Sequence, residues 1–477
     1  MSKNPYIDVD KTILGEVYTS SESLDNLITM CDDFGSRFPG TPGDKASVDF
    51  MVEKLKSYGV ENAHFETFKI PGWVRGKPLL KILEPVQKEI DCISLPHTLT
   101  GEVEANLVDL GDGAVEVYEK RKDEIGGNIV MVSSRNPPGM RRALHRTEKF
   151  NRSILAGAKG FIFVNQYPAY GPQTGGVTPI IPAVGIQYED GEYLARLLKR
   201  KGSVKIRIKT TDKNIEQTSY NVVADIPSTS KDKEYVLAGA HYEGHDISQG
   251  AIDSGSGAVT IIEMARVLNK VKDKLKRRIR LVCFGVEEIG LYGSKAYVEQ
   301  HLGELDNLRF MLNLDAAGSA GRKGIVFNDL PELEPLFKSF AEEMKAEVPL
   351  NQQVSPYSDH WPFFLKGVPT ASGGDPEGRA QQGFGRGYGH SRYDTVDKAE
   401  LRYLRDAAAN YARLMFRVAN VDKWQVKHKP ESKIKEFVKA QGYEETVALT
   451  DRLKEHIRKW DKIHPDTKAW LERTGDW

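Results

Sequence analysis

The sequence contains little cysteine: three residues in 477, at positions 31, 92 and 283. Cysteines so few and so dispersed do not build a disulfide framework, and without a CxxC spacing they do not form a cysteine zinc site. Long hydrophobic runs are also missing. No segment approaches about 18 apolar residues, the length of a transmembrane helix, and the opening MSKNPYIDVDKTILGE lacks an apolar core of signal-peptide length. These absences predict a cytoplasmic protein without a membrane partner.

An excess of charge of either sign is absent as well. Lysine plus arginine number 67 and aspartate plus glutamate number 67, so the formal net charge is zero. Bulk attraction to nucleic acid or to a membrane surface needs clustered positive charge, so we expect neither partner. The hydrophobic fraction of 40% and the charged fraction of 28% are typical of globular proteins. The length predicts about two to four domains.

Apolar runs typical of strands alternate with amphipathic runs typical of helices in the second half of the chain. We expect strands at 221–227, 235–241, 277–286 and 308–318, and helices at 257–272, 293–302 and 399–420. Helices at 11–34 and 45–59 and a strand at 64–70 precede them. Strands that alternate with helices of this length predict an α/β fold with a mostly parallel, doubly wound mixed sheet.

The region from about 101 to 212 differs in its residue pattern from the segments on either side. It has short strands rich in valine and isoleucine, such as GNIVMVSS and KGFIFVNQ, separated by glycine-containing turns. We interpret it as a smaller α/β domain, at 99–213, inserted into a catalytic domain that comprises 1–98 and 214–420. The charged, helix-prone residues 421–477 are expected to form a helical C-terminal extension, either a cap or an arm for a homo-oligomer.

The stretch YVLAGAHYEGHDISQGAIDSGSG, residues 235–257, carries the first candidates for chemistry. An apolar strand ends in His241, a polar loop follows, and Asp253 comes just before an amphipathic helix. Open α/β sheets bind their ligands outside the carboxyl ends of the strands. His241 and Asp253 are therefore expected at the ligand-binding edge of the sheet.

Further candidates come where other strands end. Glu287 and Glu288 follow the strand RLVCFGV, Asp315 ends FMLNLD, and His390 lies in a glycine-rich loop. Taken singly, a glutamate pair is usually solvated and an aspartate before a helix is usually an N-cap. Taken together, two histidines and three carboxylates suit two zinc-type ions about 3.5–4 Å apart, with one carboxylate bridging them. One glutamate of the pair would then coordinate, and the other would remain available as a base.

Five motifs in order resemble the co-catalytic di-zinc exopeptidases, the family of leucyl-type aminopeptidases and carboxypeptidase Q. They are GAHYEGHDISQGAIDSGSG, FGVEEIGLYGSKAYV, LNLDAAG, SDHWPFFLKGVP and GHSRYDTVDK. The opening FGSRFPGTPGDKAS is nearest the carboxypeptidase Q branch. The inserted region, with GAKGFIFVN, is similar to the protease-associated domain found in many members. The resemblance covers roughly residues 20–420.

The resemblance implies a role for each candidate. His241 and Asp315 would bind one ion, Glu288 and His390 the other, and Asp253 would bridge them. Glu287 would be the general base, which takes a proton from the attacking water and returns it to the leaving amine. The implied cofactor is a pair of divalent metal ions, Zn²⁺ first, with Co²⁺ or Mn²⁺ as alternatives.

The chain departs from the family pattern at two positions. Glu243 stands where the family has an aspartate that orients the first histidine, and we expect its longer side chain still to support His241. Ser254 stands where aspartate or asparagine usually follows the bridging residue. His245 is interpreted as a residue that supports a ligand or lines the substrate pocket, rather than as a ligand itself.

Four side chains flank His390 and are candidates for binding a substrate carboxylate or the oxyanion. Solvated loop residues are the alternative interpretation. The four are Arg386, Tyr388, Arg392 and Tyr393.

These observations predict a zinc-dependent exopeptidase acting on peptides, with an aminopeptidase as the first expectation. The alternative is a carboxypeptidase or dipeptidase of carboxypeptidase Q type, which Arg386 and Arg392 would favour. A non-catalytic binding protein on a peptidase fold would have lost metal ligands, which this chain keeps. A single-zinc glutaminyl cyclase of related fold would lack the ligands of one ion.

Overall fold

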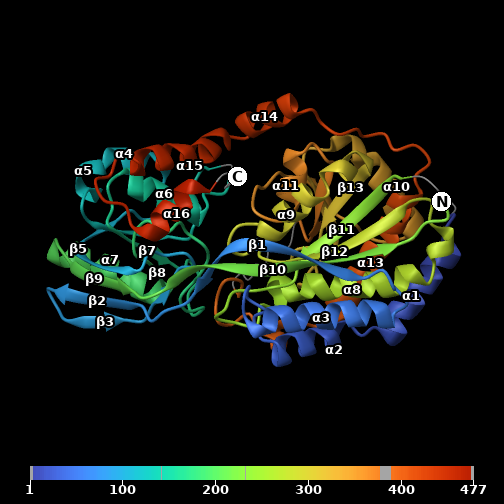
Figure 1. Ribbon diagram of the computed structural model, residues 1–477, viewed down its shortest axis with the longest axis horizontal. Coiled ribbons are helices and arrows are strands. Elements are labelled where there is room, and N and C mark those ends of the chain that lie inside the picture. Colours follow the sequence, from blue (N-terminus) through green and yellow to red (C-terminus); the bar gives the residue numbers. More distant parts are fainter. Residues whose placement is uncertain (1–3, 141, 231–232, 377–387, 474–477) are drawn as a thin grey trace. The chain divides into compact units, whose positions relative to one another are not determined.

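The computed structural model describes residues 4–140, 142–230, 233–376 and 388–473 (Figure 1). The chain forms two compact units, each assembled from separate segments. Unit 1 comprises Met1–Ile70, Thr218–Gly389 and Tyr393–Ile434, and unit 2 comprises Pro71–Gln217, His390–Arg392 and Lys435–Trp477. In the described part of the chain, no helix is both long and apolar enough to cross a membrane.

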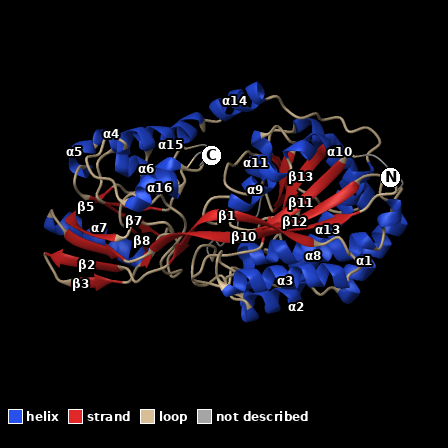
Figure 2. Ribbon diagram, viewed as in Figure 1, coloured by secondary structure: helices blue, strands red, loops and turns tan. Residues whose placement is uncertain are grey.

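Unit 1 is built on a mixed eight-stranded sheet (Figure 2). Four neighbouring strands in its centre are parallel, and β10 and β14 each run antiparallel to their central neighbour. The strand order is β1 (His64–Val74), β10 (Lys213–Ile226), β12 (Arg278–Phe284), β11 (Tyr235–His241), β13 (Leu308–Asn313), β16 (Thr370–Gly374), β14 (Gly324–Phe327) and β15 (Leu350–Gln352).

Helices cover both faces of this sheet, so its central strands are buried on both sides. Along β11, Val236, Ala238 and Ala240 face one core, while Tyr235 and Leu237 face the other. The first face carries α1 (Ile7–Ser20), α2 (Ser23–Ile28), α3 (Pro42–Ser57), α8 (Ser256–Asn269), α10 (Glu334–Met344) and α13 (Leu401–Asn420). The second carries α9 (Tyr292–Gln300) and α11 (His360–Leu365).

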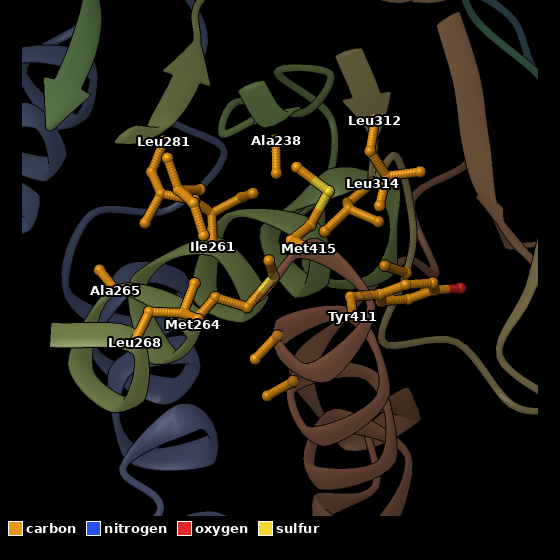
Figure 3. Close-up of a cluster of buried hydrophobic side chains, with 14 of the residues drawn as sticks. Ala238, Ile261, Met264, Ala265, Leu268, Leu281, Leu312, Leu314, Tyr411 and Met415 are labelled. Carbon is orange, nitrogen blue, oxygen red and sulfur yellow. The ribbon is translucent and has the colours of Figure 1, made fainter. Parts of the chain in front are cut away.

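Helix α8 is central to the first core. It packs against β11 and against α13, so all its residues from Ser256 to Leu268 are buried. Figure 3 shows Ala238 and Leu312 of the sheet meeting Ile261 of α8 and Met415 of α13. Because α8 begins three residues after Asp253, this packing fixes the end of the loop that carries the predicted bridging residue.

Several predicted elements have other bounds in the structure, and two of the differences have a clear local form. The predicted helix 11–34 is interrupted: α1 ends at Ser20, α2 begins at Ser23, and a turn of π-helix covers Thr29–Asp33. Helix α3 begins at Pro42, earlier than predicted, because the Thr41 side chain accepts a hydrogen bond from the backbone N–H of Asp44.

Unit 2 contains a second eight-stranded sheet with four helices from the inserted region. The strand order is β3 (Lys88–Ile90), β2 (Leu79–Glu84), β9 (Lys205–Thr210), β5 (Gly101–Asp109), β6 (Ile129–Ser133), β7 (Gly160–Val164), β8 (Ala183–Ile186) and β4 (Ile93–Ser94). The helices are α4 (Val115–Lys120), α5 (Lys122–Ile125), α6 (Arg146–Leu155) and α7 (Tyr188–Lys201). Because β2 pairs with β9, residues 79–84 lie in unit 2, outside the predicted 99–213.

The C-terminal extension is helical, with α14 (Glu431–Ala440), α15 (Glu444–Ile457) and α16 (Pro465–Glu472). Helices α15 and α16 belong to unit 2 and contribute Leu453, Ile457 and Trp470 to its core. Their apolar faces are thus occupied within this unit.

Candidate metal centre

Three neighbouring strands deliver the first group of candidates to one edge of the unit 1 sheet. His241 is the last residue of β11, Glu287 follows β12, and Asp315 follows β13. Because β11 pairs in parallel with both β12 and β13, their carboxyl ends meet at the same edge. One ligand-type atom from each of these three side chains lies within 4.8 Å of the others. The structure therefore brings together residues separated by up to 74 positions in the sequence.

The imidazole of His241 is fully buried and held in one orientation. Its Nδ1 lies 3.1 Å from the carbonyl oxygen of Glu243, which accepts the Nδ1–H. Its Nε2 lies 3.4 Å from Oδ1 of Asp253 and 3.4 Å from Oδ1 of Asp315, and has no hydrogen-bond partner among the described residues. A buried imidazole nitrogen directed between two carboxylates is a fitting donor for a metal ion.

Glu243 joins two of these strand ends. Its carboxylate accepts hydrogen bonds from the backbone N–H groups of Glu287 and Glu288, the latter at 3.2 Å. The same carboxylate lies 3.6 Å from Nδ1 of His241. Glu243 is predicted to support the imidazole. In the structure its carbonyl oxygen accepts the hydrogen bond from the ring, and its carboxylate accepts those from the glutamate pair.

A second pair lies in the same unit. Nε2 of His245 is 3.0 Å from Oε2 of Glu288, and both side chains are almost fully buried. Glu287, in contrast, is only partly buried. The two adjacent glutamates thus differ in access to solvent.

Two residues that sequence reasoning missed, Asp394 and Ser358, hold the segments of Asp253 and Asp315. The carboxylate of Asp394 accepts hydrogen bonds from the backbone N–H groups of Ile252, at 2.8 Å, and Asp253, at 3.0 Å. Ser358 donates to Oδ2 of Asp315, at 2.9 Å. Both lie inside quoted motifs, GHSRYDTVDK and SDHWPFFLKGVP, and this position was the only signal that could have found them.

Arg37, from the turn-rich opening segment, fixes the other half of the loop. Its guanidinium is fully buried and donates to the carbonyl oxygens of Tyr242 at 2.7 Å, Gln249 at 2.6 Å and Gly250 at 2.9 Å. Carbonyl partners on both sides of the loop hold its two ends together. A buried guanidinium without these partners would be energetically unfavourable, so the contacts of Arg37 favour a single conformation of the loop.

The electrostatics of this edge favour bound cations. Burial, and then the charges of Glu288 and Asp315, raise the pKa of Glu287 well above its usual range. Burial also raises the pKa of Asp394 to about 6, with Asp253 adding to the effect. Although burial opposes it, the pKa of His241 is raised well above its usual value by Asp253, Asp315 and Glu243. Divalent ions among these carboxylates would relieve their mutual repulsion, so the donor set fits a metal centre.

The remaining candidates come from the segment around position 390. His390 and Arg392 group with unit 2, where the His390 carbonyl accepts from the N–H of Thr174 at 2.8 Å and the Arg392 guanidinium lies 3.8 Å from Asp91. Arg386 lies outside the described residues. In unit 1, Tyr388 lies beneath the ammonium of Lys398 and Tyr393 is exposed. The roles of all these residues remain predictions.

Comparisons with known proteins agree with this geometry. Residues 221–415 match the model of peptidase family M28, and residues 101–194 match the PA domain. The first match lies almost entirely within unit 1, and the second lies within the inserted region of unit 2. This confirms the resemblance on which the site assignment was based.

Curated relatives include two kinds of exopeptidase. Carboxypeptidase Q of Homo sapiens is 28% identical over 438 residues, which cover 87% of this chain and 89% of the relative. Aminopeptidase YwaD of Bacillus subtilis is 28% identical over 375 residues, which cover 76% of this chain and 77% of the relative.

Solved structures confirm the predicted fold class. A peptidase M28 precursor from Shewanella amazonensis aligns with a TM-score of 0.75 and 25% identity, covering 89% of this chain and 98% of that one. A structure described as BSAP, a zinc aminopeptidase from Bacillus subtilis, aligns with a TM-score of 0.65 and 25% identity, covering 85% and 96%.

Proposed function

We propose that the chain is a zinc-dependent exopeptidase that removes N-terminal residues from peptides, with Glu287 as its general base. The observation that carries the proposal is the cluster of His241, Asp253, Asp315 and Glu287 at the carboxyl edge of the unit 1 sheet. The match of residues 221–415 to a peptidase family supports peptides as substrates. A non-catalytic binding protein would have no need to keep this complete set of groups.

We assign His241 and Asp315 to one ion, Glu288 and His390 to the other, and Asp253 to both. Imidazole nitrogen and carboxylate oxygen are donors that zinc accepts, and a solved relative is described as a zinc aminopeptidase. Co²⁺ or Mn²⁺ are alternatives with the same donor preferences. When bound, such ions acidify water and polarise the carbonyl that is attacked.

Glu287 transfers the protons in this mechanism. Its partial exposure leaves its carboxylate accessible, whereas Glu288 is buried against His245. Glu287 takes a proton from the attacking water and delivers it to the nitrogen of the leaving amine. The hydrogen bond from its backbone N–H to Glu243 keeps it in place during both transfers.

A Glu287→Gln variant tests this role. The amide cannot accept the proton, so turnover should fall by about 10²–10⁴-fold while metal content stays that of the unaltered protein. Metal analysis and peptide hydrolysis on the same sample check both expectations. Turnover that survives the substitution, or that survives a chelator, contradicts the mechanism.

The alternative function is that of a carboxypeptidase or dipeptidase of carboxypeptidase Q type. The curated relatives carry both kinds of name at similar identity, so a substrate panel decides. An aminopeptidase cleaves C-terminally amidated peptides and fails on N-acetylated ones. A carboxypeptidase does the reverse, and the Arg386 and Arg392 side chains would then be candidates for holding the substrate carboxylate.

Location and assembly belong to the same proposal. A cytoplasmic location is consistent with three cysteines that are all free. Cell fractionation and light scattering test the location and the proposed homo-oligomer.

A further inference from the structure

His245 has surroundings that the supporting or pocket role predicted for it does not explain. It lies four residues after His241 on the loop that leaves β11, and its side chain is 1% exposed. Its Nε2 lies 3.0 Å from Oε2 of Glu288, whose side chain is 2% exposed. We propose that His245 is a protein ligand of the ion that Glu288 binds, in addition to the ligands already assigned. The inference rests on the proposed function, because it concerns the same pair of ions.

The spacing of the donor atoms supports a shared ion. Two donors about 2.0–2.1 Å from a tetrahedral zinc ion lie about 3.4 Å apart. This is the separation between Nε2 of His241 and each of its two carboxylate oxygens. The 3.0 Å between Nε2 of His245 and Glu288 corresponds to a somewhat narrower angle, within the range that protein zinc sites adopt. The two pairs thus repeat one motif, an imidazole nitrogen beside a carboxylate oxygen.

The backbone holds His245 in this position independently of its side chain. Gly244 donates its N–H to Ser36 at 2.8 Å, and a Cβ on Gly244 would lie 2.5 Å from Cα of Gly250. Only glycine at position 244 therefore allows the backbone to approach Gly250 this closely. The Arg37 guanidinium fixes the far side of the same loop through the carbonyl of Gly250.

Glu288 is held just as firmly. Its backbone N–H donates to the carboxylate of Glu243 at 3.2 Å, and β12, which precedes it, pairs in parallel with the strand before His245. Two donors fixed by separate backbone contacts are preorganised, which is what a metal site requires. An added imidazole among carboxylates also shifts the preference of a site toward zinc and cobalt and away from magnesium and calcium.

The rival interpretation is a simple ion pair between a protonated His245 and Glu288. An ion pair would give no spectroscopic link between position 245 and the metal, and it would leave only two imidazoles bound to the two ions. The experiment therefore measures metal binding directly, in addition to activity.

The first test titrates metal-free full-length protein with Co²⁺, followed by calorimetry and visible absorption. The unaltered protein should bind two ions, and His245→Ala should weaken one of them by at least about 10–100-fold. His301→Gln is the matched control, because His301 also pairs with a glutamate, Glu66, at 2.9 Å in the same unit. Equal affinities for both ions in His245→Ala and in the control overturn the inference and leave the proposed function standing. Fewer than two ions in the unaltered protein overturn both.

The second test gives a positive signature. A thiolate that binds Co²⁺ produces a charge-transfer band, so the Co²⁺ form of His245→Cys should show a band that the unaltered protein lacks. Absence of the band in a folded, two-cobalt protein overturns the inference. If the variants do not fold, X-ray absorption of the unaltered two-zinc protein decides. Three imidazoles per two ions support His245 as a ligand, and two contradict it.

Discussion

Glu243 illustrates how one methylene group changes a role. With glutamate in place of the aspartate of the family pattern, the carboxylate reaches from the loop after β11 to the backbone N–H groups of Glu287 and Glu288. The carbonyl of the same residue accepts from His241. One residue thus orients an expected ligand and positions the expected base.

We predict that Glu243→Asp impairs turnover more than Glu243→Gln. The shorter side chain cannot reach the two N–H groups, whereas glutamine keeps an acceptor oxygen at the same distance. Glu243→Asp should lower kcat by about 10–100-fold with a smaller change in KM, the size typical of losing a residue that supports a metal site. Steady-state kinetics at saturating metal check this. Equal kinetics for the two variants would show that the contact with the glutamate pair is unimportant.

His97, in unit 2, offers a test of pH dependence that does not involve the candidate metal ligands. Burial lowers the pKa of His97 to about 4 from its ordinary value of 6.5, opposed by a hydrogen bond to Asn214. The folded state therefore keeps the ring neutral while the unfolded state takes up a proton. The contribution of His97 to stability is present above pH 6.5 and is lost as the pH falls toward 4, by roughly 3 kcal/mol in all.

We predict that His97→Asn flattens this part of the stability profile. Asparagine tolerates the positive φ of 66° at this position and cannot be protonated there. The apparent Tm of the full-length variant should fall less between pH 6.5 and 4 than that of the unaltered protein. Parallel profiles for the two proteins would mean that residue 97 does not titrate on unfolding.

At the scale of elements, the strand ends were predictable and the loops between them were not. The sequence shows the apolar runs, and parallel neighbours share an edge of the sheet, so the sequence predicts that His241, Glu287 and Asp315 lie together. The contacts of Arg37, Ser358 and Asp394 depend on tertiary approach between distant segments. The periodicity of apolar residues along the sequence does not predict such contacts.

Ser254 shows what a departure from the family pattern does in its own setting. Its Oγ accepts a hydrogen bond from the backbone N–H of Ala316 at 3.1 Å, and Oγ of Ser256 accepts from Gly318 at 3.2 Å. Two hydroxyls therefore link the start of α8 to the loop after β13. This link connects the segment of Asp253 to that of Asp315.

We predict that Ser254→Ala destabilises unit 1 by about 1–3 kcal/mol, because the N–H of Ala316 loses its acceptor inside the protein. Ser254→Asn keeps an acceptor, so its stability should lie closer to that of the unaltered protein. Ser57→Ala, at the exposed end of α3, is the control. Chemical denaturation of the three variants makes the comparison. A Ser254→Ala protein as stable as the Ser57→Ala control contradicts the role given to this hydroxyl.

At the scale of the whole molecule, the larger part of the C-terminal extension, from Lys435 onward, belongs to the fold of unit 2. Leu453 and Ile457 of α15 are fully buried in the core that includes Phe150 and Ile154 of α6. Polar contacts accompany them, since Thr446 donates to Glu148 at 3.0 Å. Charge and helical pattern predicted helices here, but the sequence left a cap and an oligomerisation arm as equal alternatives, because an apolar helix face does not identify its partner.

We predict that Leu453→Ala destabilises unit 2 selectively. Removing a fully buried leucine side chain costs roughly 2–5 kcal/mol, and α6 and β7 lie in the same core. Hydrogen exchange in the full-length variant should therefore accelerate in α6 and β7, while β11 and α8 of unit 1 keep their protection. Glu455→Ala, on the exposed side of the same helix, is the matched control and should change neither unit. Exchange in α6 that is equal in the two variants would mean that α15 adds nothing to this core. Faster exchange in both units would mean instead that the extension stabilises the chain as one cooperative body.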